Sequence, residues 1–210
     1  MTNFIDQPPL SDPSPLLLGR LKQQLKILDN TRDSELLGWL SISIDLVERY
    51  TWRVIRERLI IGQFSSFISS RIENNECADV LDFRRTPTNE LVQVVYKASA
   101  GDEVLDAHFT IVDSYAEIAI DSEPAILDSE KEYPIEATCN CGYKIVLGGW
   151  ACPAPIQQAI ISMAAWAYSN PSDCGSSGCS CSGAGSMSNG IRLPHEVALL
   201  ITSYLIRRFD

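Results

Sequence analysis

Two stretches of helical periodicity, joined by a short acidic turn, restrict the fold of this chain more than any other feature. Leucines on one face of the first predicted helix are Leu17, Leu21, Leu25 and Leu28, spaced by three or four residues as one helical face requires. The second helix begins near Asp33, because the N-terminal end of a helix dipole favours acidic side chains. Its apolar stripe is Leu36, Leu40, Ile44 (or Ser43) and Val47. The sequence therefore predicts an N-terminal helical hairpin.

The rest of the chain adds short strands and two more helices. Residues 1–13 are rich in proline and are expected to form an extended arm. Short runs rich in Val, Ile, Phe and Tyr, separated by turn residues, predict antiparallel strands over about 78–147, at 80–83, 91–97, 107–112, 115–120 and 135–147. Periodicity does not decide whether 54–64 is helix or strand. Helical patterns follow after Pro153 and over 194–208, with a Cys/Gly/Ser loop at 172–189 between them. We predict a single α+β domain over 14–210, mainly a helical bundle (the hairpin plus two C-terminal helices) with an inserted small antiparallel β section.

Charge and hydrophobicity exclude several classes of function. The 210 residues include 17 Lys and Arg against 27 Asp and Glu, a formal net charge of −10. A nucleic-acid binder needs a basic surface, so specific DNA binding is not expected. No apolar run is long enough for a membrane span, and the first residues carry no basic region typical of a signal peptide. We expect an intracellular protein without membrane contact.

Seven cysteines are the first place to look for chemistry. Cys174, Cys179 and Cys181 are metal-ligand candidates because they lie close together in the Gly/Ser loop. Neither of the two Cys-x-Cys pairs, Cys179 with Cys181 and Cys139 with Cys141, supplies the two-to-four-residue gap of a zinc knuckle. Cys139 and Cys141 would share one face of a strand, as buried thiols do. Plain thiols are the preferred interpretation, ahead of a disulfide and of a structural metal.

Catalytic groups are equally sparse. The two histidines are His108, in a β-like run, and His195, at a predicted helix start. A histidine in a first helical turn is ordinarily a partly exposed residue, and no local signature pairs either one with a nucleophile. The glycines of the loop lack the Lys-Ser/Thr of a phosphate loop. We therefore expect no enzyme activity and no cofactor.

The order of the elements resembles the head–tail connector (adaptor) proteins of tailed phages. In that family the helical hairpin closes with a Glu-x-x-Thr-Gly-Arg-like segment, which Glu48-Arg49-Tyr50-Thr51-Trp52-Arg53 matches except that Trp52 stands where glycine is common. The other matching segments, in chain order, are 21–27, 33–37, 81–87, 92–96, Gly142-Tyr143, 152–160, 166–168, and the spaced positions Pro194, Val197, Leu200, Tyr204 and Arg207. The resemblance covers about residues 16–207.

This resemblance implies a structural virion protein of the neck, assembled in the host cytoplasm. Such proteins form a twelve-membered ring under the portal, extend the DNA channel and present the docking surface for a tail or neck protein. A ring suits a small domain that repeats one head-to-tail contact until it closes. A negatively charged channel wall would let DNA pass without binding it.

The end of the chain is the candidate portal contact. The resemblance places that contact in the C-terminal segment, where two cations stand between two apolar residues: Ile206, Arg207, Arg208 and Phe209. Arg and aromatic side chains are enriched in interface hot spots. In the alternative interpretation the arginines only complement the helix dipole and Phe209 folds onto its own domain. Two other functions stay open: a small thiol- or zinc-dependent protein built on the Cys loop, and a soluble regulatory binding module.

Overall fold

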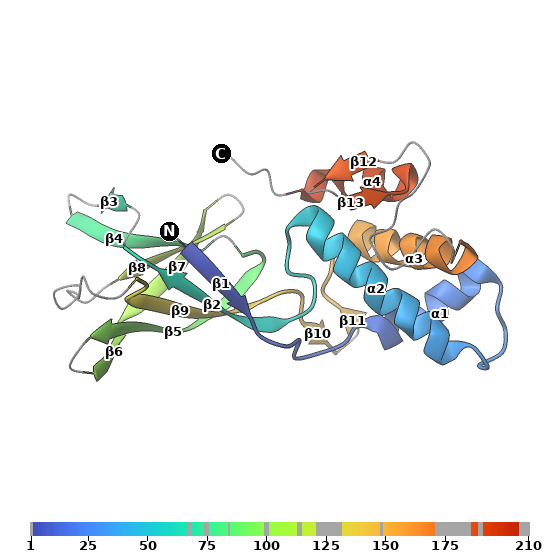
Figure 1. The fold of residues 1–210 in the computed structure, drawn as a ribbon, viewed down its shortest axis with the longest axis horizontal. Helices are drawn as coiled ribbons and strands as arrows, with labels where there is room; N and C mark the ends of the chain where they lie inside the picture. Colours follow the sequence, from blue (N-terminus) through green and yellow to red (C-terminus); the bar gives the residue numbers. More distant parts are fainter. Residues whose placement is uncertain are drawn as a thin grey trace. The chain divides into compact units, whose positions relative to one another are not determined.

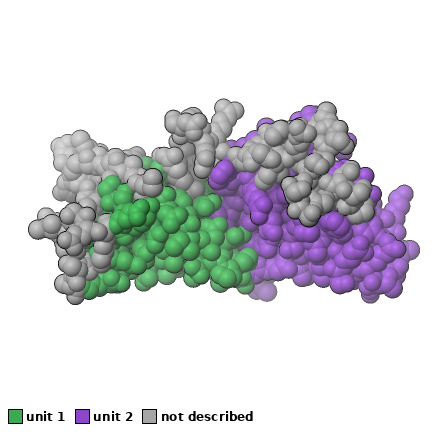
Figure 2. Space-filling model, in the orientation of Figure 1, with its two compact units in different colours: residues 1–10, 57–142 green, residues 11–56, 143–210 purple. Residues whose placement is uncertain are grey.

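A computed structural model describes most of the chain and divides it into two compact units. The described residues are 2–66, 69–73, 76–83, 85–98, 101–112, 115–120, 132–147, 149–170, 186–188 and 191–205 (Figure 1). Residues 1–10 and 57–142 form a β unit, and residues 11–56 and 143–210 form a helical unit, coloured separately in Figure 2. Each unit is thus assembled from two separate stretches of the chain.

Four helices and two short hairpins make up the described part of the helical unit. The helices are α1 (Ser14–Leu25), α2 (Asp33–Thr51), α3 (Ala154–Ser169) and α4 (His195–Ile201). The hairpins pair β10 (Ile145–Val146) with β11 (Gly149–Trp150), and β12 (Ser186–Ser188) with β13 (Ile191–Leu193). Helix α3 contacts α1, α2 and α4, so its apolar face forms the centre of the core.

The predicted helical stripes are confirmed with one exception. Leu17 and Leu21 of α1 are buried, as are all the stripe positions predicted for α2. Leu28, in contrast, is 98% exposed. The helix ends earlier than its leucine spacing suggests, because Lys26 adopts a left-handed conformation (φ 57°) and the amide of Ile27 turns back to the carbonyl of Lys22. Leu28 therefore leaves the helical face.

The helix expected over 194–208 is α-helical only over part of that range. It begins at His195 and ends at Ile201, and a 3₁₀ turn follows over Thr202–Tyr204. Leu205 is already extended. The side chain of Arg53 donates to the carbonyl of Tyr204 (Nε–O 2.7 Å), so a group from α2's end satisfies a carbonyl that a longer helix would use itself.

Two antiparallel sheets form the β unit. The five-stranded sheet has the order β1 (Thr2–Asp6), β2 (Arg58–Phe64), β9 (Ile135–Cys141), β5 (Thr88–Ala98) and β6 (Gly101–Leu105). The four-stranded sheet has the order β3 (Ser69–Glu73), β4 (Glu76–Phe83), β8 (Tyr115–Ile120) and β7 (Ala107–Val112). The prediction of a mainly helical bundle with a small β insertion is therefore wrong: the chain is α+β with a full β unit.

The missed strands explain this error. β1 and β6 are edge strands of the larger sheet and β3 is an edge of the smaller one. Four of the five residues of β1 and four of the five of β6 are exposed, so the sequences of these two strands lack clear alternation. The 1–13 segment, expected as an extended arm, supplies β1, which pairs with β2. β2 itself alternates buried and half-buried residues, but its range was ambiguous between helix and strand.

Aromatic side chains join the two sheets. Phe64 of β2 and Phe83 of β4 are fully buried, and the ring of Phe4 on β1 packs edge-on against both, with centroids 6.3 and 5.3 Å away. Gly62 leaves room for these rings, because a Cβ at this position would lie 2.8 Å from Phe64 Cε2 and 2.9 Å from Phe83 Cε2.

We expect Gly62→Ala to lower the free energy of unfolding by about 1–3 kcal/mol, as overpacking a filled core does. The matched control is Gly38→Ala, on the exposed surface of α2, where nothing lies within 4 Å of the added Cβ. Alanine should stabilise this helix by about 0.5–1 kcal/mol. Urea unfolding of both variants measures the two effects, and equal stabilities would contradict the role given to Gly62.

Candidate functional site

The residues predicted as the portal contact and as possible metal ligands lie outside the described residues. This applies to the candidate portal contact, Ile206 to Phe209, and to the loop cysteines Cys174, Cys179 and Cys181. The structure therefore neither groups these residues nor separates them. It does describe the chain up to Leu205, and so defines the base from which the C-terminal segment departs.

Arg53 fixes this base of the C-terminal segment. Besides its hydrogen bond to the Tyr204 carbonyl, its guanidinium lies 5.9 Å from the centroid of the Tyr204 ring, within the range of a cation–π contact. Tyr143, nearby on the chain that returns to the helical unit, has its pKa raised by burial while Arg53 opposes that effect. The last described residues are thus tied to the end of α2.

The segment that carries the family resemblance forms a tight turn after α2. One carboxylate oxygen of Glu48 accepts hydrogen bonds from the amides of Ile55 (2.7 Å) and Arg56 (2.8 Å). The hydroxyl of Thr51 donates to the Val47 carbonyl (2.7 Å). Trp52 caps the helix in the left-handed conformation (φ 58°), which favours glycine. The motif is thus a folding element that directs the chain from α2 toward β2.

The cysteines that the structure describes are buried thiols. Cys139 and Cys141 face the same side of β9 and are fully buried, which confirms the sequence interpretation. Burial raises the pKa of Cys139, and it raises that of Cys141 to about 12 although the hydrogen bond between Cys141 and Thr88 opposes it. Burial likewise raises the pKa of Cys152. All three thiols therefore stay protonated at neutral pH and are poor nucleophiles.

No catalytic or metal cluster is found within the described ranges. His108 lies on β7 and His195 opens α4, both with exposed side chains. No group of three His, Cys, Asp or Glu side chains is placed to hold an ion among these residues. Of the helices described, none is long and apolar enough to cross a membrane.

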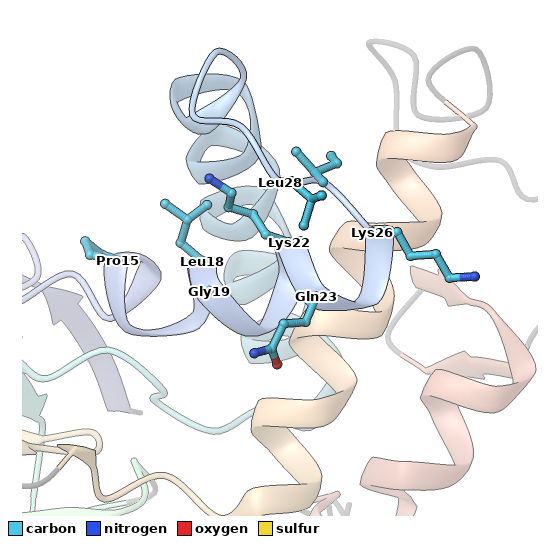
Figure 3. A pocket seen from close by; sticks show the side chains of 8 residues that line it. Pro15, Leu18, Gly19, Lys22, Gln23, Lys26 and Leu28 are labelled. Atoms are coloured by element: carbon cyan, nitrogen blue, oxygen red, sulfur yellow. The ribbon is translucent and has the colours of Figure 1, made fainter.

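An open groove of about 710 Å³ runs along the exposed side of α1. We call it the α1 groove; its lining is Pro15, Leu18, Gly19, Lys22, Gln23, Lys26, Ile27 and Leu28. In Figure 3, Leu18 and Lys22 point from the helix toward the side on which Leu28 lies. The ammonium of Lys22 is held by Asn30 (2.6 Å) and Asp33 (2.8 Å), while Lys26 is exposed. The groove thus combines an apolar surface with a cationic end.

The β10–β11 hairpin presents a second apolar surface. Ile145, Val146 and Leu147 are all exposed, Leu147 completely; we call these three residues the apolar tip. Its base is anchored by Trp150, which is buried and whose indole donates to the Tyr143 carbonyl (3.0 Å). Sequence reasoning missed this feature because the apolar run appeared to continue the strand from Ile135. The available signal was Gly142, which has a positive φ of 102° and separates β9 from the hairpin.

The fold as a whole is similar to that of chains in structures of gene transfer agent particles. Similar solved structures include the neck of an empty gene transfer agent (GTA) particle computed with C6 symmetry (TM-score 0.62, 19% identity, covering 100% of this chain and 97% of that chain). The neck of the native GTA particle computed with C12 symmetry matches with a TM-score of 0.61 and 17% identity, over 98% of this chain and 97% of that one. The virion of the native GTA particle matches with a TM-score of 0.61 and 18% identity, over 100% and 97%.

These matches show a shared fold over essentially the whole chain. They agree with the resemblance to head–tail connectors stated from the sequence. No protein-family model and no curated protein sequence matches the chain.

Proposed function

We propose that this protein is a structural, non-catalytic component of a virion neck, in which copies of the chain form a closed ring. The observation that carries this proposal is the fold shared along the whole chain with neck structures computed with C6 and C12 symmetry. The buried, protonated thiols of the described residues are compatible with a non-catalytic role. The net charge of −10 is compatible with a scaffold through which DNA passes, because negative charges repel phosphates.

In its finer form the proposal is a head-to-tail adaptor. A ring of twelve copies would join the portal to a tail or neck protein and extend the DNA channel. The portal contact is assigned to Ile206, Arg207, Arg208 and Phe209, supported by the anchoring of Tyr204 on Arg53 immediately before this segment. A segment that leaves a fixed base loses less conformational freedom on binding than one that leaves a loose end.

The ring is tested by imaging. We expect the purified protein, mixed with portal particles, to form rings of twelve copies in electron micrographs, and native mass spectrometry to give a mass twelve times that of one chain. Chains that stay monomeric and do not bind the portal would overturn the proposal and favour a regulatory binding module. Stoichiometric bound zinc would instead favour the alternative built on the Cys loop.

A further inference from the structure

The helical unit exposes two apolar features of opposite shape. The apolar tip protrudes from the β10–β11 hairpin, and the α1 groove is concave. Leu147 in the tip and Leu28 in the groove are the two most exposed large apolar side chains in the described part of the chain. Exposed apolar groups gathered in this way typically mark an interaction surface.

A ring requires two such features on every copy. In a cyclic assembly each chain presents one surface to its neighbour on one side and a different, complementary surface to the neighbour on the other side. The apolar tip cannot pack against a second apolar tip as it can against a groove. Both features belong to one compact unit, so the same unit carries both halves of a repeating contact.

We infer that the apolar tip of one copy seats in the α1 groove of the next copy around the ring. This inference rests on the proposed function, because the occupant of the groove is a second copy of this chain. The contact brings Leu147 of one copy against Leu18 and Leu28 of the next. It removes from water the apolar side chains that a single copy leaves exposed.

The charge of the groove predicts which substitutions in the apolar tip weaken this contact most. Lys22 and Lys26 line it, while the apolar tip carries no charge. Because Asp33 already pairs with Lys22, the exposed Lys26 carries the argument: its ammonium would repel a cation introduced into the tip and could pair with an anion there. Leu147→Lys is therefore expected to weaken ring formation more than Leu147→Asp.

Complementation between two full-length variants tests the inference. Leu147→Lys damages the tip and leaves the groove intact; Leu28→Asp damages the groove and leaves the tip intact. Because both side chains are exposed in the single chain, each variant should unfold at the temperature of the unmodified protein. Alone, each should raise the concentration at which half of the chains are in rings by at least about tenfold.

Mixed in equal amounts, the two variants should form rings again. Alternating copies would pair the new lysine with the new aspartate at every second contact and keep the original contact at the others. The matched control is Leu199→Asp, on an exposed apolar residue of α4, which should leave ring formation unchanged. Ring formation is measured by native mass spectrometry, with portal present if the unmodified chain requires it, and the unfolding temperatures are measured by differential scanning calorimetry.

The outcomes separate this inference from the function on which it rests. If the unmodified protein forms rings and Leu147→Lys forms them at the same concentration, or if the mixture is no better than its components, the contact lies elsewhere. If the unmodified protein forms no ring with or without portal, the proposed function fails first.

Discussion

Removing residues 206–210 is expected to abolish attachment to the portal while the protein still folds. The reason is that Arg207 and Arg208 can bind carboxylates in a bidentate manner and Phe209 can fill a pocket, whereas the described core ends before this segment. Attachment is measured by co-sedimentation of the protein with portal-bearing heads. Circular dichroism checks that the truncated chain keeps its helices and strands.

A double substitution separates charge from geometry in this segment. Arg207→Lys together with Arg208→Lys keeps both charges but loses the planar fork of guanidinium, so we expect weakened attachment rather than complete loss. Truncated protein that joins portal-bearing heads at normal efficiency would show that the assignment of the contact is wrong.

Replacing Glu48 by alanine should destabilise the protein by about 2–4 kcal/mol, since hydrogen bonds to a charged group are strong and their loss leaves amides without a partner. In this case the amides of Ile55 and Arg56 lose the acceptor that defines the turn after α2. For a chain of 210 residues the melting temperature should fall by roughly 4–16 °C, as measured by differential scanning calorimetry.

Two further variants make this expectation specific. Glu48→Gln keeps a neutral acceptor oxygen and should lose only part of the stability. Glu35→Ala removes an exposed carboxylate from the first turn of α2 and should cost no more than about 1 kcal/mol. If Glu48→Ala melts no lower than Glu35→Ala, the turn is held by other contacts.

Local pattern predicted those elements that carry their own signal. The apolar stripes of α1 and α2, the helix after Pro153, and the strands β4, β5, β7, β8 and β9 lie close to where the sequence indicates them, because each has a local pattern of its own. Strand β1 was missed, since it depends on a backbone ladder with β2, a partner distant in sequence. Strand β6 pairs with the preceding strand β5 but buries only Leu105, so it carries no apolar alternation. That error led directly to the wrong balance between helix and sheet.

The candidate site was predicted less well than the fold. The segment around Glu48 was recognised only as a pattern, and its two hydrogen bonds to Ile55 and Arg56 depend on how the chain turns after α2. The apolar tip could not be separated from β9, because exposure is a property of the folded surface and not of a run of aliphatic residues. Leu28 is a second example: its spacing placed it on the buried face of α1, but the helix ends at Leu25 and the side chain is exposed.

The interleaving of the two units has a consequence for how the chain is made on the ribosome. The central strand β9 ends at Cys141, and the central helix α3 ends at Ser169. A nascent chain must therefore reach two-thirds of its length before the larger sheet can close, and further still before the helical core can. Until then α1 lacks the α3 surface on which it packs. A translation product that stops early therefore exposes the α1 groove before the helical core has folded. Quality control can remove this product before it reaches an assembling particle.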